Sequence, residues 1–193
     1  MKICCYNLKG GVGKTTLALS LAISQNYGVI TNDIYSPLEK ALPNDRLLKL
    51  NKNDAIPNIP QDWNIIFDFG GYVDNRVIDA LKICDCVLIP TQKNYTDLKT
   101  TLASILEIET YNKNIVIVVN RIKNEAEFLN AENDLKPYTN YPILPLKESK
   151  PLSEICYTGQ LVQDTPVANY IHRNMIHQCE QICNFILKYN KGK

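Results

Sequence analysis

Short apolar runs recur along the chain, and stretches with helical spacing separate them. The runs cover residues 3–6, 28–31, 64–67, 86–89, 114–119 and 141–144. The central runs do not alternate with polar residues, so both of their faces are expected to be buried. This pattern is typical of strands inside a parallel β-sheet.

The segments between the runs predict helices. A helix is expected over residues 15–25, after the loop that follows the first run, and another near residues 95–111. The second buries one face made of Leu98, Leu102, Ile105 and Leu106. A C-terminal helix buries another face, made of Ile171, Met175, Cys179, Ile182, Cys183 and Ile186.

Residues 34–62 interrupt this alternation with four prolines and are predicted to form loops around a short helix. No linker divides the chain. Strands that alternate with helices predict an α/β fold, with a doubly wound, mostly parallel sheet flanked by helices. We therefore expect a single domain over residues 1–193.

The strongest chemical signal is a glycine-rich segment between the first predicted strand and its helix, here called the phosphate loop. It consists of Lys9, Gly10, Gly11, Val12, Gly13, Lys14, Thr15 and Thr16. Glycines let the backbone turn tightly and bring N–H groups close to phosphate oxygens, and the helix N-terminus adds positive partial charge. Lys14 is expected to reach the β- and γ-phosphates, Thr15 to offer a hydroxyl to Mg²⁺, and Thr16 to donate to the α-phosphate. The segment predicts binding of ATP with Mg²⁺.

Leu8 stands where the usual phosphate-loop pattern has glycine, which gives the variant form KGGxGK[ST]. This form resembles the signature of the ParA/MinD family of deviant Walker-A ATPases, which belong to the SIMIBI class of P-loop proteins. The family's additional lysine matches Lys9. The resemblance implies that Lys9 crosses a dimer interface to the partner's nucleotide, where a second cation stabilises charge that grows during phosphoryl transfer. It therefore implies a P-loop ATPase that forms a homodimer when ATP binds and hydrolyses ATP slowly.

Two acids at the ends of apolar runs extend the resemblance. Asp33 matches the second acid of the family's DxD motif, while Thr31 replaces the first. The resemblance assigns Asp33 to orienting the attacking water near Mg²⁺; the alternative is that Asp33 only caps the next turn. Asp68 follows three apolar residues at the end of the run over residues 64–67, a Walker-B pattern whose acid holds Mg²⁺. The implied catalytic residues are Lys9, Lys14 and Asp33, and the implied metal ligands are Thr15, Asp33 and Asp68.

Further segments complete the implied nucleotide site. Phe69, Gly70 and Gly71 follow the Walker-B acid and are expected to form a second switch, switch II, beside the γ-phosphate. Asn120 and Arg121 follow the run ending at residue 119. The resemblance implies that the Asn120 amide recognises the adenine edge, because an amide offers a donor and an acceptor together. An asparagine that supports a turn at a strand end remains an equal interpretation.

Composition adds limits. The formal net charge is +1, and no run approaches the roughly 20 apolar residues of a membrane span. The seven cysteines form no CxxC pair, so buried thiols in a reducing compartment are expected rather than a metal or redox site. We expect a cytoplasmic protein.

Among the family's roles, the short chain most resembles the small partition ATPases of plasmids, because its first strand begins at residue 2 and leaves no room for a helix-turn-helix. That resemblance implies a nucleoid-associated ATP dimer that binds non-specific DNA and is released when a small centromere-binding ParB-type protein stimulates hydrolysis. Lys147, Lys150, Arg173 and Lys188 are the candidate DNA contacts.

Three alternatives stay open. A positioning ATPase would recruit conjugation or secretion machinery with the same switch. A MinD-like membrane switch would use residues 184–193, but the apolar residues there continue the face of the predicted C-terminal helix, so no stable membrane anchor is expected. A scaffold that binds nucleotide without turnover is compatible with Thr31.

Overall fold

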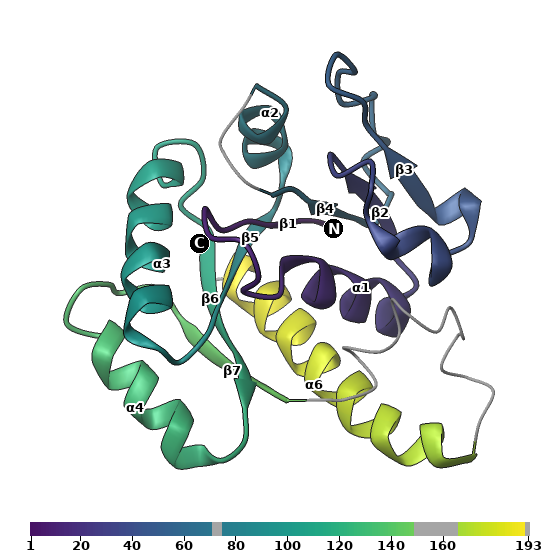
Figure 1. Ribbon diagram of the computed structural model, residues 1–193. Helices are drawn as coiled ribbons and strands as arrows, with labels where there is room; N and C mark the ends of the chain where they lie inside the picture. Colours follow the sequence, from purple (N-terminus) through teal and green to yellow (C-terminus); the bar gives the residue numbers. More distant parts are fainter. Residues whose placement is uncertain (71–74, 149–165, 192–193) are drawn as a thin grey trace.

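The structure is a computed structural model that describes residues 1–70, 75–148 and 166–191, with side chains of the last segment described from residue 176. Its centre is a sheet of seven strands, ordered β3-β2-β4-β1-β5-β6-β7, in which all neighbouring strands are parallel (Figure 1). The strands are β1 (Lys2–Cys5), β2 (Gly28–Thr31), β3 (Leu47–Lys49), β4 (Ile65–Asp68), β5 (Cys86–Thr91), β6 (Ile115–Ile122) and β7 (Ile143–Lys147). The predicted parallel α/β fold is confirmed.

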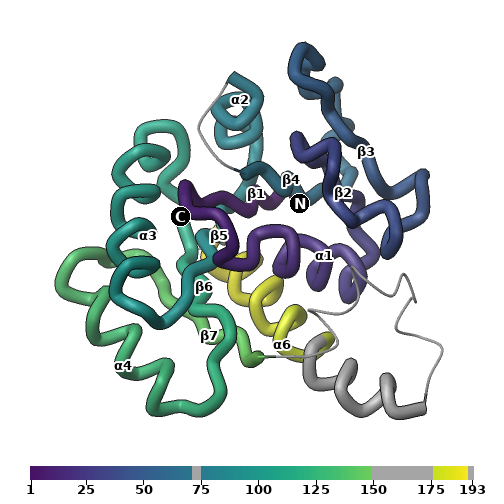
Figure 2. The backbone as a smooth tube through the Cα atoms, viewed as in Figure 1, coloured from purple at the N-terminus to yellow at the C-terminus, as the bar shows by residue number. Residues whose placement is uncertain are grey.

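Helices cover both faces of the sheet (Figures 1 and 2). One face packs against α1 (Lys14–Gln25) and α6 (Pro166–Lys191). The other packs against α2 (Asn75–Ile83), α3 (Tyr95–Ile108) and α4 (Glu125–Leu135). Two short 3₁₀ helices, η1 (Pro37–Lys40) and η2 (Asn44–Arg46), lie between β2 and β3.

Alternate strand residues feed two separate cores. In β1, Ile3 and Cys5 belong to the cluster under α1 and α6, whereas Cys4 belongs to the cluster under α2, α3 and α4. All three are fully buried. This double burial explains why the central strands carry no polar alternation.

Several details differ from the sequence predictions. Residues 34–62 contain two 3₁₀ helices and the edge strand β3. The sequence did not predict β3, because a strand of three residues is too short to produce a recognisable period. Leu106 was predicted to be buried and is 70% exposed. The buried stripe of α3 follows Leu98, Ile105 and Ile108, and Leu106 lies about 100° around the helix from Ile105.

Other predictions hold for the described residues. Six cysteines, Cys4, Cys5, Cys84, Cys86, Cys179 and Cys183, are buried and form no disulfide within the described part of the chain, and Cys156 lies outside that part. Among the candidate DNA contacts, Lys150 and the side chain of Arg173 also lie outside the described part. Of the described helices, none is long and apolar enough to cross a membrane.

The topology brings one set of loops together. Because all strands are parallel, the loops after β1, β2, β4 and β6 emerge at the same edge of the sheet. The chain passes from β1 to β2 on one side of the sheet centre and later to β5 on the other. Such a change of direction leaves a crevice at the carboxyl ends of the central strands, which is where open α/β sheets bind ligands.

Candidate nucleotide-binding site

An open pocket of about 590 Å³ lies at this edge of the sheet. Half of its residues come from the loops after β1, β2 and β4, three come from the first turn of α1, and β4, α2 and β6 supply one each. They are Gly10, Gly11, Gly13, Lys14, Thr15, Thr16, Asn32, Asp33, Asp68, Gly70, Arg76 and Arg121. Segments far apart in the sequence thus converge, and most of the predicted site residues are among them.

Two glycines of the phosphate loop have backbone angles that only glycine adopts readily. Gly11 has φ 77° and Gly13 has φ 101°. A Cβ atom on Gly13 would also lie 2.2 Å from Nδ2 of Asn120. That amide donates to the Val12 carbonyl at 3.2 Å. Any side chain at position 13 would therefore displace the Asn120 amide or the phosphate loop.

Lys14 folds back over the phosphate loop. Its Nζ donates to the carbonyls of Asn7 at 3.0 Å and of Lys9 at 2.9 Å. Burial lowers the pKa of Lys14, while the nearby Asp68 carboxylate opposes this shift. The ammonium group is therefore held inside the loop at a cost in solvation.

Asn7, fully buried at the start of the loop, sets the position of this segment. Its Nδ2 donates to the Pro90 carbonyl at 3.0 Å and to Thr101 Oγ1 at 3.1 Å. Its Oδ1 accepts from the Lys9 amide at 2.8 Å and from Ser104 Oγ at 3.3 Å. The loop is thereby attached to both β5 and α3.

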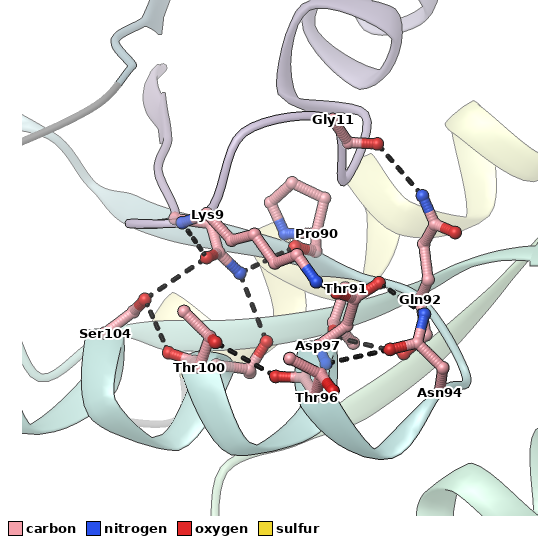
Figure 3. Close-up of polar contacts among 12 residues, drawn as sticks. Lys9, Gly11, Pro90, Thr91, Gln92, Asn94, Thr96, Asp97, Thr100 and Ser104 are labelled. Atoms are coloured by element: carbon pink, nitrogen blue, oxygen red, sulfur yellow. Dashed lines mark hydrogen bonds and ion pairs between the residues drawn. The ribbon is translucent and has the colours of Figure 1, made fainter.

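Lys9 does not line the pocket in this structure. Its Nζ forms an ion pair with Oδ1 of Asp97, in the first turn of α3 (Figure 3). The Asp97 side chain is 3% exposed and that of Lys9 is 35% exposed. Asn94 caps the helix and also donates to Asp97 Oδ2 at 2.7 Å. In this single chain, the additional lysine of the loop is thus bound to its own subunit.

The two predicted metal acids differ in environment. Asp68 ends β4, is 3% exposed and accepts a hydrogen bond from Thr15. Burial raises the pKa of Asp68 to about 6, although Thr15 and Lys14 both favour its charged form. Asp33 is exposed, and its Oδ1 accepts from the Tyr35 amide at 3.0 Å. Asp33 therefore lines the pocket and caps the following turn at the same time.

Thr31 bridges the ends of two neighbouring strands. Its hydroxyl donates to the Asp68 carbonyl at 2.9 Å and accepts from the Asp33 amide at 3.1 Å. The residue that replaces the family's first acid is fully buried. It fixes the backbone at both acids and does not line the pocket.

The switch II residues separate in space. Phe69 is fully buried and packs against Phe67, with ring centroids 5.6 Å apart, so it belongs to the core. Gly70 lines the pocket, and its amide donates to Asn32 Oδ1 at 3.3 Å. A Cβ on Gly70 would lie 3.4 Å from Cε of Lys14. Gly71 lies outside the described residues.

Asn120 and Arg121 occupy an irregularity in β6. The register with β7 shifts between Val119 and Ile122, and Arg121 has φ 59°. Asn120 is 5% exposed; besides its bond to Val12, its Oδ1 accepts from the Arg121 amide at 2.8 Å. The Arg121 side chain is exposed and lines the pocket. Asn120 thus supports the phosphate loop here, and its contact with adenine stays a prediction.

Comparison with known proteins shows the family and the fold of this chain. The family model described as the CobQ/CobB/MinD/ParA nucleotide binding domain matches residues 3–162. The chain belongs to this family. Its ParA and MinD members are nucleotide-hydrolysing P-loop ATPases, and the fold described above is the ParA/MinD fold.

Solved structures support the fold over nearly the whole chain. The MinD cell division protein of Aquifex aeolicus is 19% identical, with a TM-score of 0.62, and the match covers 95% of this chain and 96% of that one. For MinD of Pyrococcus horikoshii in complex with Mg-ADP, the identity is 17%, the TM-score 0.66 and the coverage 94% and 95%. A ParA family ATPase of Chlorobium tepidum is 17% identical, with a TM-score of 0.62, and the match covers 92% of this chain and 98% of that one. No curated protein sequence matches the chain.

The residues of this ParA/MinD-type pocket fit a magnesium nucleotide. The hydroxyl of Thr15 and the carboxylate of Asp68 are hydrogen-bonded to each other, and hard oxygen donors of this kind suit Mg²⁺. A Cβ on Gly10 or Gly11 would meet no atom within 4 Å, so the loop backbone faces open space. Mg²⁺ would neutralise charge on the phosphates. Thr15 and Asp68 would hold it.

Sequence reasoning missed four members of this ParA/MinD-type site. Asn7 and Asp97 position the phosphate loop, and Asn32 and Arg76 line the pocket. Asn32 lies beside Asp33 and could have been found by its place at the end of a strand. The sequence carries no recognisable signal for the other three, because their roles depend on contacts with distant segments.

Replacing Asp68 with asparagine is expected to stabilise the nucleotide-free protein above pH 6. The folded-state pKa of about 6 exceeds the ordinary value of 3.8, so the ionised carboxylate costs stability above pH 6. That cost is roughly 3 kcal/mol at about 1.4 kcal/mol per pKa unit, and it disappears as pH falls towards 4. Melting curves of both proteins between pH 4 and 8 measure this cost. A stability difference between the two proteins that does not depend on pH would show that the ionised carboxylate is not its cause. The same variant is expected to lose the Mg²⁺-dependent part of nucleotide affinity.

Proposed function

We propose that this chain is a ParA-type ATPase of DNA segregation, whose form bound to Mg·ATP is a sandwich dimer that binds non-specific DNA. The observation that carries the proposal is Lys9. It belongs to a phosphate loop of the KGGxGK[ST] form, and in the single chain it is paired with Asp97. A lysine that serves the partner's nucleotide has to leave this pair when the dimer forms.

The pocket residues suggest how ATP is held and cleaved. Loop amides and Lys14 bind the phosphates, and Thr15 and Asp68 hold Mg²⁺. Asp33, exposed at the mouth of the pocket, orients the attacking water. Lys9 from the partner adds positive charge where the transferred phosphoryl group develops negative charge. Arg121 and Asn120 lie on the β6 side, where the base is expected.

The chemistry serves a cycle of assembly and release. ATP joins two subunits because each nucleotide is contacted from both sides, and hydrolysis removes the shared phosphate and loosens the dimer. A small centromere-binding ParB-type protein stimulates that step. Gly70 of switch II and Asp33, which caps the next turn, both line the pocket, so loss of the terminal phosphate acts on these two residues first.

DNA binding is expected to require ATP and to weaken steeply with salt. Lys147 and Lys188 are both exposed, and Gln178 of α6 accepts from the Lys147 amide at 2.7 Å, so β7 and α6 present them from adjoining elements. Changing both lysines to glutamate should weaken binding to random duplex DNA. It should also reduce the slope of the logarithm of the binding constant against the logarithm of the salt concentration by about one for each DNA phosphate that is no longer neutralised. Lys52→Glu, on an exposed loop, is the matched control.

Titration with ATP, ADP and no nucleotide at several salt concentrations makes this test. DNA binding of equal strength in all three states, or a salt dependence that the double variant leaves unchanged, would contradict the role of these lysines in DNA binding. A second candidate, recruitment of a protein complex, is favoured by the net charge of only +1. An ATP dimer that binds no DNA would support it.

A further inference from the structure

Arg76 is a pocket residue that no motif predicts. It lies in the first turn of α2, the helix after switch II, and its side chain is half-buried. It lines the same pocket as Lys14, Asp33 and Gly70. Its position relative to the phosphate loop shows what it can contact.

The order of the strands places Arg76 at one end of the pocket. The phosphate loop follows β1, with β4 and β2 on one side and β5 and β6 on the other. Arg121 comes from the β6 side. Arg76 follows β4, on the side of Asp33 and Asp68. Asp68 would hold Mg²⁺, which would neutralise charge on the phosphates, so the terminal phosphate would lie at the end of the pocket that carries these acids.

The chemistry of arginine suits that place. A guanidinium group stays charged at every physiological pH, and its planar fork of N–H donors matches phosphate oxygens in a bidentate manner. Besides Lys14, the only described cations that line the pocket are Arg76 and Arg121. Lys9 is paired with Asp97, so Arg76 supplies positive charge beside the two acids in the single chain.

Arg76 also connects the pocket with the segment after β3. Its Nη1 donates to the Asn51 carbonyl at 2.8 Å. Asp54 holds that turn by accepting from the Asn51 amide at 2.7 Å and from its side chain at 2.9 Å. A phosphate that attracts the guanidinium group therefore acts on the turn at residues 51–54.

We infer that Arg76 binds the terminal phosphate of ATP from the β4 side of the pocket, so that it distinguishes ATP from ADP and reports the difference to the turn at residues 51–54. This inference rests on ATP being the ligand of the pocket. It does not depend on DNA binding or on a partner protein. It assigns to this arginine a role in the single chain, before Lys9 of a partner subunit arrives.

The test compares affinities for a non-hydrolysable ATP analogue and for ADP, both with Mg²⁺, in dilute protein that remains monomeric. Arg76→Ala should lose roughly 10- to 100-fold in affinity for the analogue, the range for a hydrogen bond to a charged group, and keep its affinity for ADP. Arg76→Lys should lose less. Lys82→Ala removes an exposed charge from the last turn of the same helix and should change neither affinity.

Several outcomes decide the matter. Equal losses for both nucleotides would show that Arg76 only anchors the turn after β3, and no loss for either would exclude contact with phosphate; each overturns the inference. Retained ADP affinity shows that a variant is folded, and Arg76→Lys decides the question if Arg76→Ala does not fold. A wild-type protein that binds neither nucleotide would refute the inference together with the proposed ATPase. Discrimination by Arg76 without DNA binding would refute only the segregation role.

Hydrogen exchange at residues 50–54 gives a second measurement. In the wild type, the analogue and ADP should produce different protection there, and Arg76→Ala should remove the difference. A difference that persists in the variant would show that another path connects the turn with the nucleotide, and would contradict the reporting role.

Discussion

Lys14→Ala is expected to abolish nucleotide binding at ordinary ATP concentrations. Lys14 is the phosphate-loop cation that lines the pocket, and the carbonyls that hold it belong to Asn7 and Lys9. Removing one partner of a desolvated charge pair costs about 2–5 kcal/mol, which corresponds to a loss of about 30-fold to several thousand-fold. Isothermal titration with Mg·ATP measures the affinity.

Folding of this variant has to be checked separately, because the Lys14 ammonium group also ties the loop to Asn7. Lys99→Ala, an exposed lysine of α3, is the matched control for loss of a positive charge. Since burial lowers the pKa of Lys14, its removal should not greatly destabilise the nucleotide-free protein. A folded Lys14→Ala protein that binds ATP normally would refute the assignment of the phosphate site.

Asp97→Asn is expected to strengthen the ATP-dependent dimer, whereas Lys9→Ala should prevent it without abolishing ATP binding. In the single chain, Asp97 holds Lys9 back by an ion pair that is buried on the acid's side. Because Lys9 is about one third exposed, breaking each pair costs only about 1 kcal/mol. A dimer has to break two, so the substitution should lower its dissociation constant about 30-fold.

Sedimentation equilibrium with the non-hydrolysable analogue measures this constant. Asparagine at position 97 can still accept the hydrogen bond from Asn94, so the start of α3 should remain intact. Asp79→Asn, at an exposed position of α2, is the matched control. If Asp97→Asn leaves the dimer unchanged, the ion pair does not restrain assembly. If Lys9→Ala forms normal dimers, the sandwich arrangement is wrong for this protein.

The parts of this site that could be predicted are those encoded locally. The positive φ angles of Gly11 and Gly13, the position of Thr15 at the start of α1 and the place of Asp68 at the end of β4 all follow from short patterns. Apolar runs without polar alternation were enough to predict a sheet buried on both faces. These features depend on neighbours within a few residues, so they appear in the sequence as continuous motifs.

The parts that could not be predicted depend on contacts between distant segments. Asn7 bonds to residues of β5 and α3 more than 80 positions away, and Asp97 meets Lys9 only after the sheet has formed. Phe69 was expected in a mobile switch, but the alternation of strand β4 continues through it into the core. The role of such residues depends on whether they are buried, and the type of a single residue does not show this.

Thr31 illustrates a different limit. Its hydroxyl joins the end of β2 to the end of β4, so the chain lacks an acid where the family has one and gains a bridge between two strands. Asp33 and Asp68 are then the acids that line the pocket. ATP turnover through Asp33 stays a prediction, and a scaffold that binds nucleotide without turnover stays its alternative.

The central claim is that ATP, and not ADP, joins two copies of this chain through the phosphate loop. Light scattering of the purified protein with Mg²⁺ and the non-hydrolysable analogue, with ADP and without nucleotide tests it most directly. We expect twice the monomer mass with the analogue alone, and a monomer of 21.9 kDa in the other two states. The same mass in all three states, whether monomer or dimer, would contradict it.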